Sequence, residues 1–124
     1  MNYPSLLLAT FAAFGASAAY YIALAKQRAA VSQAARESGR PKPGILLLEL
    51  ARTGLLAAVL SYLLGRLDVS GIGDAARLSL LLWVAFPCTL LTGSAIYEKV
   101  PWKLATIHAG DWAIKLLIMT AILR

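Results

Sequence analysis

Four long apolar stretches alternate with short polar segments along this chain. Each stretch has about 20 residues, which as a helix spans about 30 Å, the thickness of the hydrocarbon core of a bilayer. The pattern therefore predicts an all-α fold, an integral membrane bundle of four transmembrane helices, in a single membrane domain over residues 1–124. The predicted helices cover residues 5–24, 45–64, 78–97 and 104–123.

Composition agrees with this class of protein. The chain is 60% hydrophobic with a mean hydropathy of +0.70, whereas a soluble domain is about 45–50% apolar. Four membrane-spanning helices use most of the 124 residues. This leaves no room for a soluble domain, so one bundle is the expected architecture.

The net charge of +6 comes from basic residues in the segments between the spans. Such placement follows from membrane insertion and predicts contact with anionic lipid headgroups rather than with nucleic acid. Loops 25–44 and 98–103 hold seven basic residues against three on the other side. The positive-inside rule then predicts that both termini lie outside. The seven are Lys26, Arg28, Arg36, Arg40, Lys42, Lys99 and Lys103, and the three are Arg66, Arg77 and Arg124.

Aromatic and basic residues mark the predicted membrane interfaces. Aromatic rings prefer the headgroup level, where neighbouring lysine side chains extend toward water. Four residues are expected to act as such anchors, at the end of the first span and the start of the fourth. They are Tyr20, Tyr21, Trp102 and Lys103.

The helix of the first span is expected to continue beyond the membrane. An alanine-rich stretch without glycine or proline runs from there to Glu37. Ser38-Gly39 is expected to end this helix, and Pro41 and Pro43 prevent its resumption. The segment is therefore a linker inside one domain.

Two features bear on helix packing. Gly15 and Ala19 form a small-xxx-small pair, which favours close helix contact in lipid, although alanine is also simply common in such helices. Pro87 predicts a kink near Ala85, followed by the small Gly93. A structural kink is favoured over a functional hinge because membrane helices tolerate proline.

Five ionisable residues lie inside the apolar spans. His108, Asp111 and Lys115 are spaced i, i+3 and i+7, so they share one helical face. A charge at the bilayer centre costs about 3 kcal/mol. That face is therefore expected to meet protein, water or a substrate. Glu49 and Arg52 share a face of the second span.

Depth along the helices suggests partners for these residues. Glu49 and Arg52 lie about 6 and 10 Å into their span, and His108, Asp111 and Lys115 about 9, 13 and 19 Å into theirs. The second and fourth spans are therefore expected to pack together through an Arg52–Asp111 ion pair, with Lys115 joining Asp111. The result is either a network that fixes helix register or an ion, proton or anion site.

Sequence motifs give little support to catalysis. His108 is the only histidine, and its side chain titrates near neutral pH, which suits proton transfer. With one histidine and the distant Cys88, the chain lacks the clustered ligand spacing of a metal site. No phosphate loop or nucleophile motif occurs. No catalytic residue, metal or cofactor is predicted, and an enzyme is disfavoured.

The last third of the chain carries a family resemblance. Its matching elements are the "PWKL" turn at Pro101–Leu104, the Ala109-Gly110 pair and the apolar ending from Leu116 to Leu123. These elements resemble a bacterial family of small membrane proteins known as domain of unknown function 1761. His108 stands where that family often has Asn or Asp. The resemblance implies four helices in a bacterial inner membrane and brings no established activity.

Three functions remain open on these grounds. The first is a homo-oligomeric transport or channel-like protein, with a polar intramembrane site between the second and fourth helices. The second is a structural or accessory subunit of a larger membrane complex. The third, ranked last, is a membrane enzyme that uses His108 with Asp111 as a base. The expected partners are the lipid bilayer and either further copies of this chain or other membrane subunits.

Overall fold

The computed structural model describes residues 2–37 and 42–124, and these residues form helices and turns without a strand. Four helical segments are long and apolar enough to cross a membrane, as the sequence predicts. The third segment is α5, η1 and α6 in succession. The helices are α1 (Tyr3–Ala23), α2 (Ala25–Val31), α3 (Gln33–Glu37), α4 (Pro43–Arg66), α5 (Ile72–Trp83), the π-helical η1 (Val84–Cys88), α6 (Thr89–Tyr97) and α7 (Trp102–Leu123).

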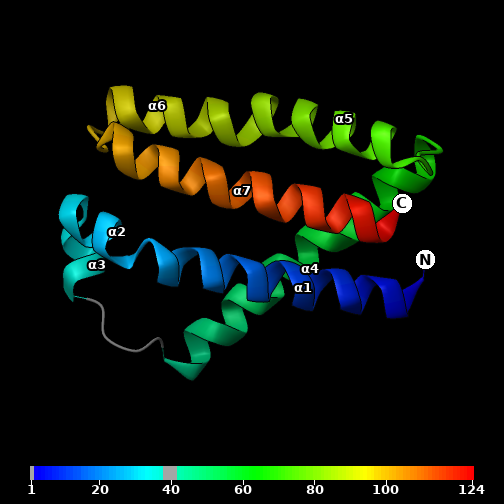
Figure 1. The fold of residues 1–124 in the computed structure, drawn as a ribbon, viewed down its shortest axis with the longest axis horizontal. Coiled ribbons are helices and arrows are strands. Elements are labelled where there is room, and N and C mark those ends of the chain that lie inside the picture. Colours follow the sequence, from blue (N-terminus) through cyan, green and yellow to red (C-terminus); the bar gives the residue numbers. More distant parts are fainter. Residues whose placement is uncertain (1, 38–41) are drawn as a thin grey trace.

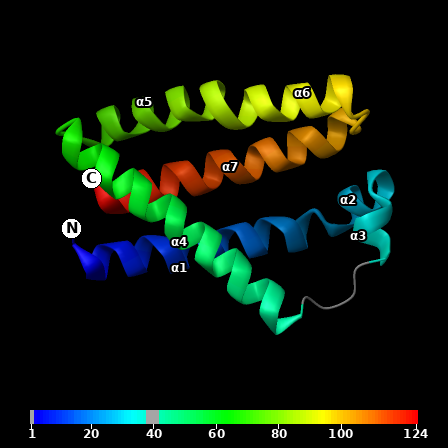
Figure 2. The ribbon, with the colours of Figure 1, turned by 180° about the vertical axis from the view of Figure 1, so that it is seen from behind.

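Helix α7 lies at the centre of the arrangement (Figure 1). It runs antiparallel to the continuous α5–α6 segment on one side and packs along α1 on the other. Helix α4 crosses the layer formed by these helices diagonally, as Figure 2 shows from behind. Both termini lie at one end of the bundle, and α2, α3 and the turn between α6 and α7 lie at the other. We call the latter the α2–α3 end.

Small residues allow α1, α4 and α7 to approach closely. Ala9, Ala13 and Ala57 are fully buried where α1 meets α4 and α7. Leu60 and Met119 fill the space beside them and are equally inaccessible. In lipid, helix association depends on such packing, because acyl chains are as apolar as the side chains. This contact therefore forms the core of the bundle.

The small residues singled out in the sequence lie elsewhere. Gly15 and Ala19 are exposed on the outer side of α1. A Cβ built on Gly15 or Gly93 would meet nothing within 4 Å. The expected close packing of Gly15 and Ala19 is thus not made within this chain, because Ala9 and Ala13 face the neighbouring helices instead.

The third span contains a π-helical turn around its proline. Residues Val84–Cys88 form this turn, and Pro87 is buried within it. Proline lacks the N–H that an α-helix requires, so the backbone bonding pattern changes locally. The Thr89 hydroxyl donates to the Val84 carbonyl oxygen at 3.1 Å. A side chain thus supplies a backbone hydrogen bond at the point where the sequence predicts a kink.

The expectation of one helix continuing to Glu37 is wrong. Helix α1 ends at Ala23, and Leu24 leaves the helical conformation with φ −103° and ψ 17°. Ser32 is extended, and its Oγ accepts a hydrogen bond from the Ala35 N–H at 3.1 Å, as an N-cap residue does. Ser32 therefore divides this alanine-rich segment into the two short helices α2 and α3. The predicted stop at Ser38-Gly39 lies outside the described residues.

A buried hydroxyl pair joins α5 to α7. The Ser79 hydroxyl donates to the Leu116 carbonyl oxygen at 3.1 Å and shares a 2.6 Å hydrogen bond with the Thr120 hydroxyl. Both side chains are almost inaccessible. Interhelical hydrogen bonds of this kind stabilise membrane proteins by about 1 kcal/mol.

We expect Ser79→Ala to lower the free energy of unfolding by about 1 kcal/mol, since that interhelical bond is lost. Unfolding in mixed micelles with a denaturing detergent, followed by circular dichroism, measures the change. Ser94→Ala is the matched control, because the Ser94 hydroxyl bonds the Leu90 carbonyl of its own helix. Equal effects of the two substitutions would contradict an interhelical role for Ser79.

Candidate functional site

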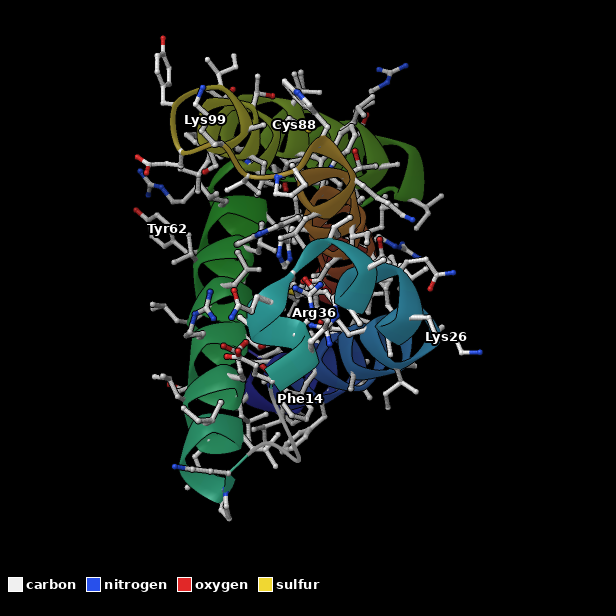
Figure 3. The ribbon with its side chains drawn as sticks, turned by 90° about the vertical axis from the view of Figure 1, so that its left-hand side faces the viewer. Phe14, Lys26, Arg36, Tyr62, Cys88 and Lys99 are labelled. Atoms are coloured by element: carbon white, nitrogen blue, oxygen red, sulfur yellow. The ribbon has the colours of Figure 1, made fainter. Side chains whose placement is uncertain are left out.

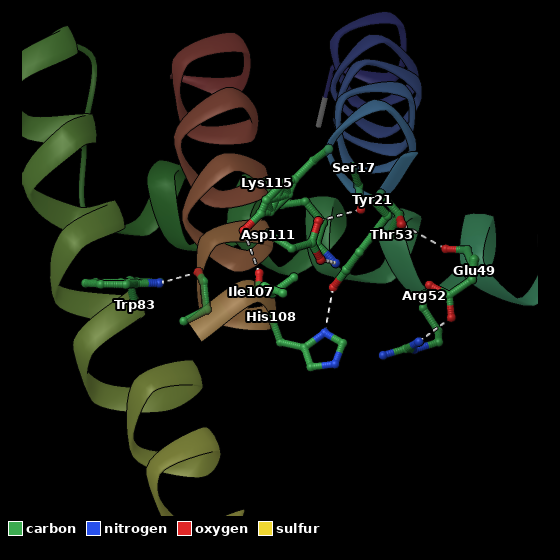
Figure 4. Close-up of polar contacts among 12 residues, drawn as sticks. Ser17, Tyr21, Glu49, Arg52, Thr53, Trp83, Ile107, His108, Asp111 and Lys115 are labelled. Atoms are coloured by element: carbon green, nitrogen blue, oxygen red, sulfur yellow. Dashed lines mark hydrogen bonds and ion pairs between the residues drawn. The ribbon is translucent and has the colours of Figure 1, made fainter. Parts of the chain in front are cut away.

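Asp111 is the centre of the polar cluster. It lies on α7 and is only 3% exposed. The Ser17 hydroxyl of α1 donates to its Oδ1 at 2.5 Å, and the Lys115 ammonium lies 2.9 Å from its Oδ2 (Figure 4). Both carboxylate oxygens therefore have a partner. This satisfies a buried charge that otherwise carries a large desolvation penalty.

A second set of contacts lies one turn closer to the α2–α3 end. The Tyr21 hydroxyl and His108 Nδ1 share a hydrogen bond of 2.7 Å. The Arg28 guanidinium of α2 lies over the Tyr21 ring, 4.8 Å from its centroid. The Tyr20 hydroxyl donates to the Ile107 carbonyl oxygen at 2.8 Å. Both tyrosines thus turn their hydroxyls toward α7 instead of serving only as headgroup anchors.

Gly110 allows Tyr20 to approach α7 this closely. A Cβ built on Gly110 would lie 3.0 Å from Tyr20 Cζ and closer still to the hydroxyl oxygen. Real Cβ atoms essentially never come so near. The glycine is therefore needed for this position of the Tyr20 side chain against α7, and the sequence marks Gly110 only as part of a family motif.

The charged pair of α4 is arranged differently from the prediction. The Arg52 guanidinium pairs with the Glu49 carboxylate of its own helix, and both side chains are exposed. The predicted Arg52–Asp111 ion pair is wrong, because Asp111 faces α1 and Lys115 satisfies its second oxygen. Glu49 and His108 share a similar depth, but His108 has Tyr21 as its partner.

A pocket of about 330 Å³ nevertheless connects the predicted residues of α4 and α7. Three of the five intramembrane ionisable residues line it, together with apolar side chains. The Lys115 ammonium takes part in both features, since it pairs with Asp111 and lies over the Trp112 ring at 4.8 Å. We call this the α4–α7 pocket. Its lining residues are Glu49, Arg52, Thr53, Leu55, Leu56, Val59, Trp112 and Lys115.

The sequence did not indicate that several residues belong to this site, although Tyr21 and Arg28 were expected at the membrane interface. Ser17, Tyr21 and Arg28 come from α1 and α2, which the depth argument did not consider. Trp83 of α5 donates its indole N–H to the Ala109 carbonyl oxygen at 2.8 Å. An available signal was the position of Tyr20 and Tyr21 opposite the start of the fourth span, since both spans begin or end at the same membrane surface.

The remaining predicted residues lie at the surface. Trp102 and Lys103 are exposed at the start of α7. Figure 3 looks onto the α2–α3 end, where Lys26, Arg36 and Lys99 also lie. Among the described residues, no three histidine, cysteine, aspartate or glutamate side chains gather as a metal site would require.

Helix length, apolar composition and the buried polar cluster define a helical protein of the multi-pass membrane class. Over residues 5–124 the chain matches the family described as "Protein of unknown function (DUF1761)", and it belongs to that family. Comparison with curated proteins gives no match. Comparison with solved structures gives none either.

Proposed function

We propose that this protein is a transport-type protein of the bacterial inner membrane that binds an anionic group in the α4–α7 pocket and moves it together with a proton. One observation carries the proposal: an intramembrane pocket is lined by Glu49, Arg52 and Lys115. Their charges sum to +1, which suits a ligand with one negative charge. Intramembrane charges that border a cavity are a common feature of solute pathways.

Lys115 provides the coupling in this proposal. Its ammonium lies beside Asp111 and also lines the pocket. When an anion enters, Lys115 turns toward it, and Asp111 loses its counter-charge. A buried carboxylate without a partner is strongly disfavoured, so Asp111 binds a proton on one carboxylate oxygen. One negative and one positive charge enter together, and the step is electrically neutral.

Oligomerisation completes the pathway in this proposal. A single four-helix bundle encloses little volume, and the pocket opens on the outside of α4 and α7. Copies of the chain that assemble around this face would surround the ligand. We expect both termini to lie on the outer side of the membrane, with the basic α2–α3 end in the cytoplasm.

Proton entry into proteoliposomes tests the proposal. Vesicles loaded with a pH-sensitive dye receive an external acid pulse in chloride, phosphate or gluconate buffer. We expect internal acidification to depend on the anion and to fall about tenfold in Asp111→Asn, the equivalent of about 1.4 kcal/mol in the barrier. Arg52→Gln is expected to weaken the dependence on the anion.

Exposed Arg77 gives the matched control, since Arg77→Gln removes one charge on α5, away from the pocket. Its rate is expected to equal that of the unchanged protein. Identical rates in all variants and in protein-free vesicles would contradict transport. They would favour the alternative of an accessory subunit, which co-purification with a larger membrane complex would then identify.

A further inference from the structure

The geometry points to an amphiphile with an anionic phosphate or carboxylate head as the ligand of the α4–α7 pocket, entering sideways from the leaflet at the α2–α3 end. This inference rests on the proposed function, because it names the class of the anion. It follows from the order of polar and apolar residues along the pocket, from its open side and from the charge of the nearby surface.

The pocket changes character along α4. Glu49, Arg52 and Thr53 line its first part, and Leu55, Leu56 and Val59 line the part that follows. Arg52 and Val59 are seven residues apart, which is about 10 Å along a helix. A ligand that fits both parts therefore has a charged head and an apolar portion that together span about that length. A small inorganic anion uses only the first part.

The order of charged and apolar residues along the pocket also matches the head-to-tail direction of a lipid. Helix α4 begins toward the α2–α3 end and runs toward the end that holds the termini (Figure 1). Along α4, the charged part of the pocket is therefore nearer the α2–α3 end, and the apolar part follows toward the end that holds the termini. Lipids of the leaflet at the α2–α3 end have the same head-to-tail direction.

The two charged residues that α4 contributes to the pocket are exposed. In the salt bridge of α4, 60% of the Arg52 side chain and 43% of the Glu49 side chain are exposed. Exposed charges inside a span are costly next to acyl chains. Arg52 has five N–H donors in a fork that matches phosphate and carboxylate, and Lys115 adds an ammonium from α7. An anionic head satisfies these donors where acyl chains do not.

The α2–α3 end of the molecule is rich in positive charge. Helices α2 and α3 contribute Lys26, Arg28 and Arg36 at that end, and the turn before α7 contributes Lys99. Each basic residue near an anionic leaflet attracts its headgroups by about 1 kcal/mol. Anionic amphiphiles are thus concentrated in the leaflet at that end, from which they reach the pocket.

Native mass spectrometry of the whole protein tests the inference. The protein is reconstituted with equal amounts of phosphatidylglycerol and phosphatidylcholine and released into detergent. We expect bound phosphatidylglycerol, with retention falling about tenfold in Arg52→Gln or Lys115→Gln, since each removes one charge-assisted contact. Arg77→Gln, with the same loss of charge on α5, is expected to retain the lipid.

Two further measurements separate the head from the tail. Val59→Trp fills the apolar part from its exposed side and leaves every charge in place, so retention is expected to fall while the helical circular dichroism stays the same. Excess glycerol phosphate carries the headgroup without tails, and we expect it not to displace the lipid.

Four results would overturn the inference: equal retention of both lipids, retention unchanged in the pocket variants, full displacement by glycerol phosphate, or a lipid-free dimer in which a second copy covers α4. Failure of transport is distinguishable from these. Selective lipid retention without proton entry contradicts only the transport proposal. Proton entry that depends on Asp111, without lipid retention, contradicts only the inference.

Discussion

Replacing Asp111 by leucine is expected to lower the free energy of unfolding by about 3–5 kcal/mol, because the Lys115 ammonium is left buried without its counter-charge. The Lys115 side chain is 12% exposed and lies 2.9 Å from the carboxylate. Denaturing-detergent titration followed by circular dichroism gives the change. The Ser17 hydroxyl also loses its acceptor, which adds to the effect.

A double substitution separates the charge from the packing. Asp111→Leu with Lys115→Met replaces the ion pair by apolar groups, and such replacements are often neutral or stabilising. We therefore expect most of the lost stability to return. Glu49→Gln serves as a comparison, since its exposed pair with Arg52 is expected to contribute at most about 1 kcal/mol. If Asp111→Leu cost no more than Glu49→Gln, a central structural role for Asp111 would be excluded.

The second large effect is expected at Gly110. An added methyl group would overlap the Tyr20 ring, so Gly110→Ala forces α1 and α7 apart or swings the tyrosine away from the Ile107 carbonyl. Overpacking of this kind costs about 1–3 kcal/mol. The expected sign is opposite to that of helix propensity, which favours alanine over glycine by about 1 kcal/mol.

A variant without the Tyr20 side chain provides the reference protein for this measurement. In Tyr20→Ala the space beside Gly110 is free, and Gly110→Ala is then expected to be neutral or slightly stabilising. A double-mutant cycle from denaturing-detergent titrations measures the coupling between the two positions. Additive effects would show that the glycine has no part in the contact with Tyr20.

The helices were predictable because the bilayer dictates their length and composition. Each observed span begins within a few residues of its predicted start except the third, where α5 begins at Ile72 and not near residue 78. That difference arises because the charged Asp74 and Arg77 interrupt the apolar pattern before residue 78, although a helix end at the membrane surface accommodates charge. The break between α2 and α3 depends on Ser32, whose capping role needs the geometry of α3.

The site was predicted only in part. Depth counting places residues along a helix but gives no information about which neighbour they face. Lys115 therefore joins Asp111 as the i, i+4 spacing indicates, whereas Arg52 pairs with Glu49, three residues away, instead of crossing to α7. The tyrosines of α1 have both a polar tip and an apolar ring, so their composition fits a headgroup anchor and a helix contact equally well.

The diagonal course of α4 gives the protein unequal cross-sections in the two leaflets. At the end that holds the termini, α4 lies close to its neighbours, and toward the α2–α3 end its first turns diverge from them (Figures 1 and 2). A tapered body displaces more lipid from one monolayer than from the other. A tapered protein is more stable in a bilayer whose curvature fits its shape. The curvature of the surrounding bilayer therefore influences the angle between α4 and the other helices.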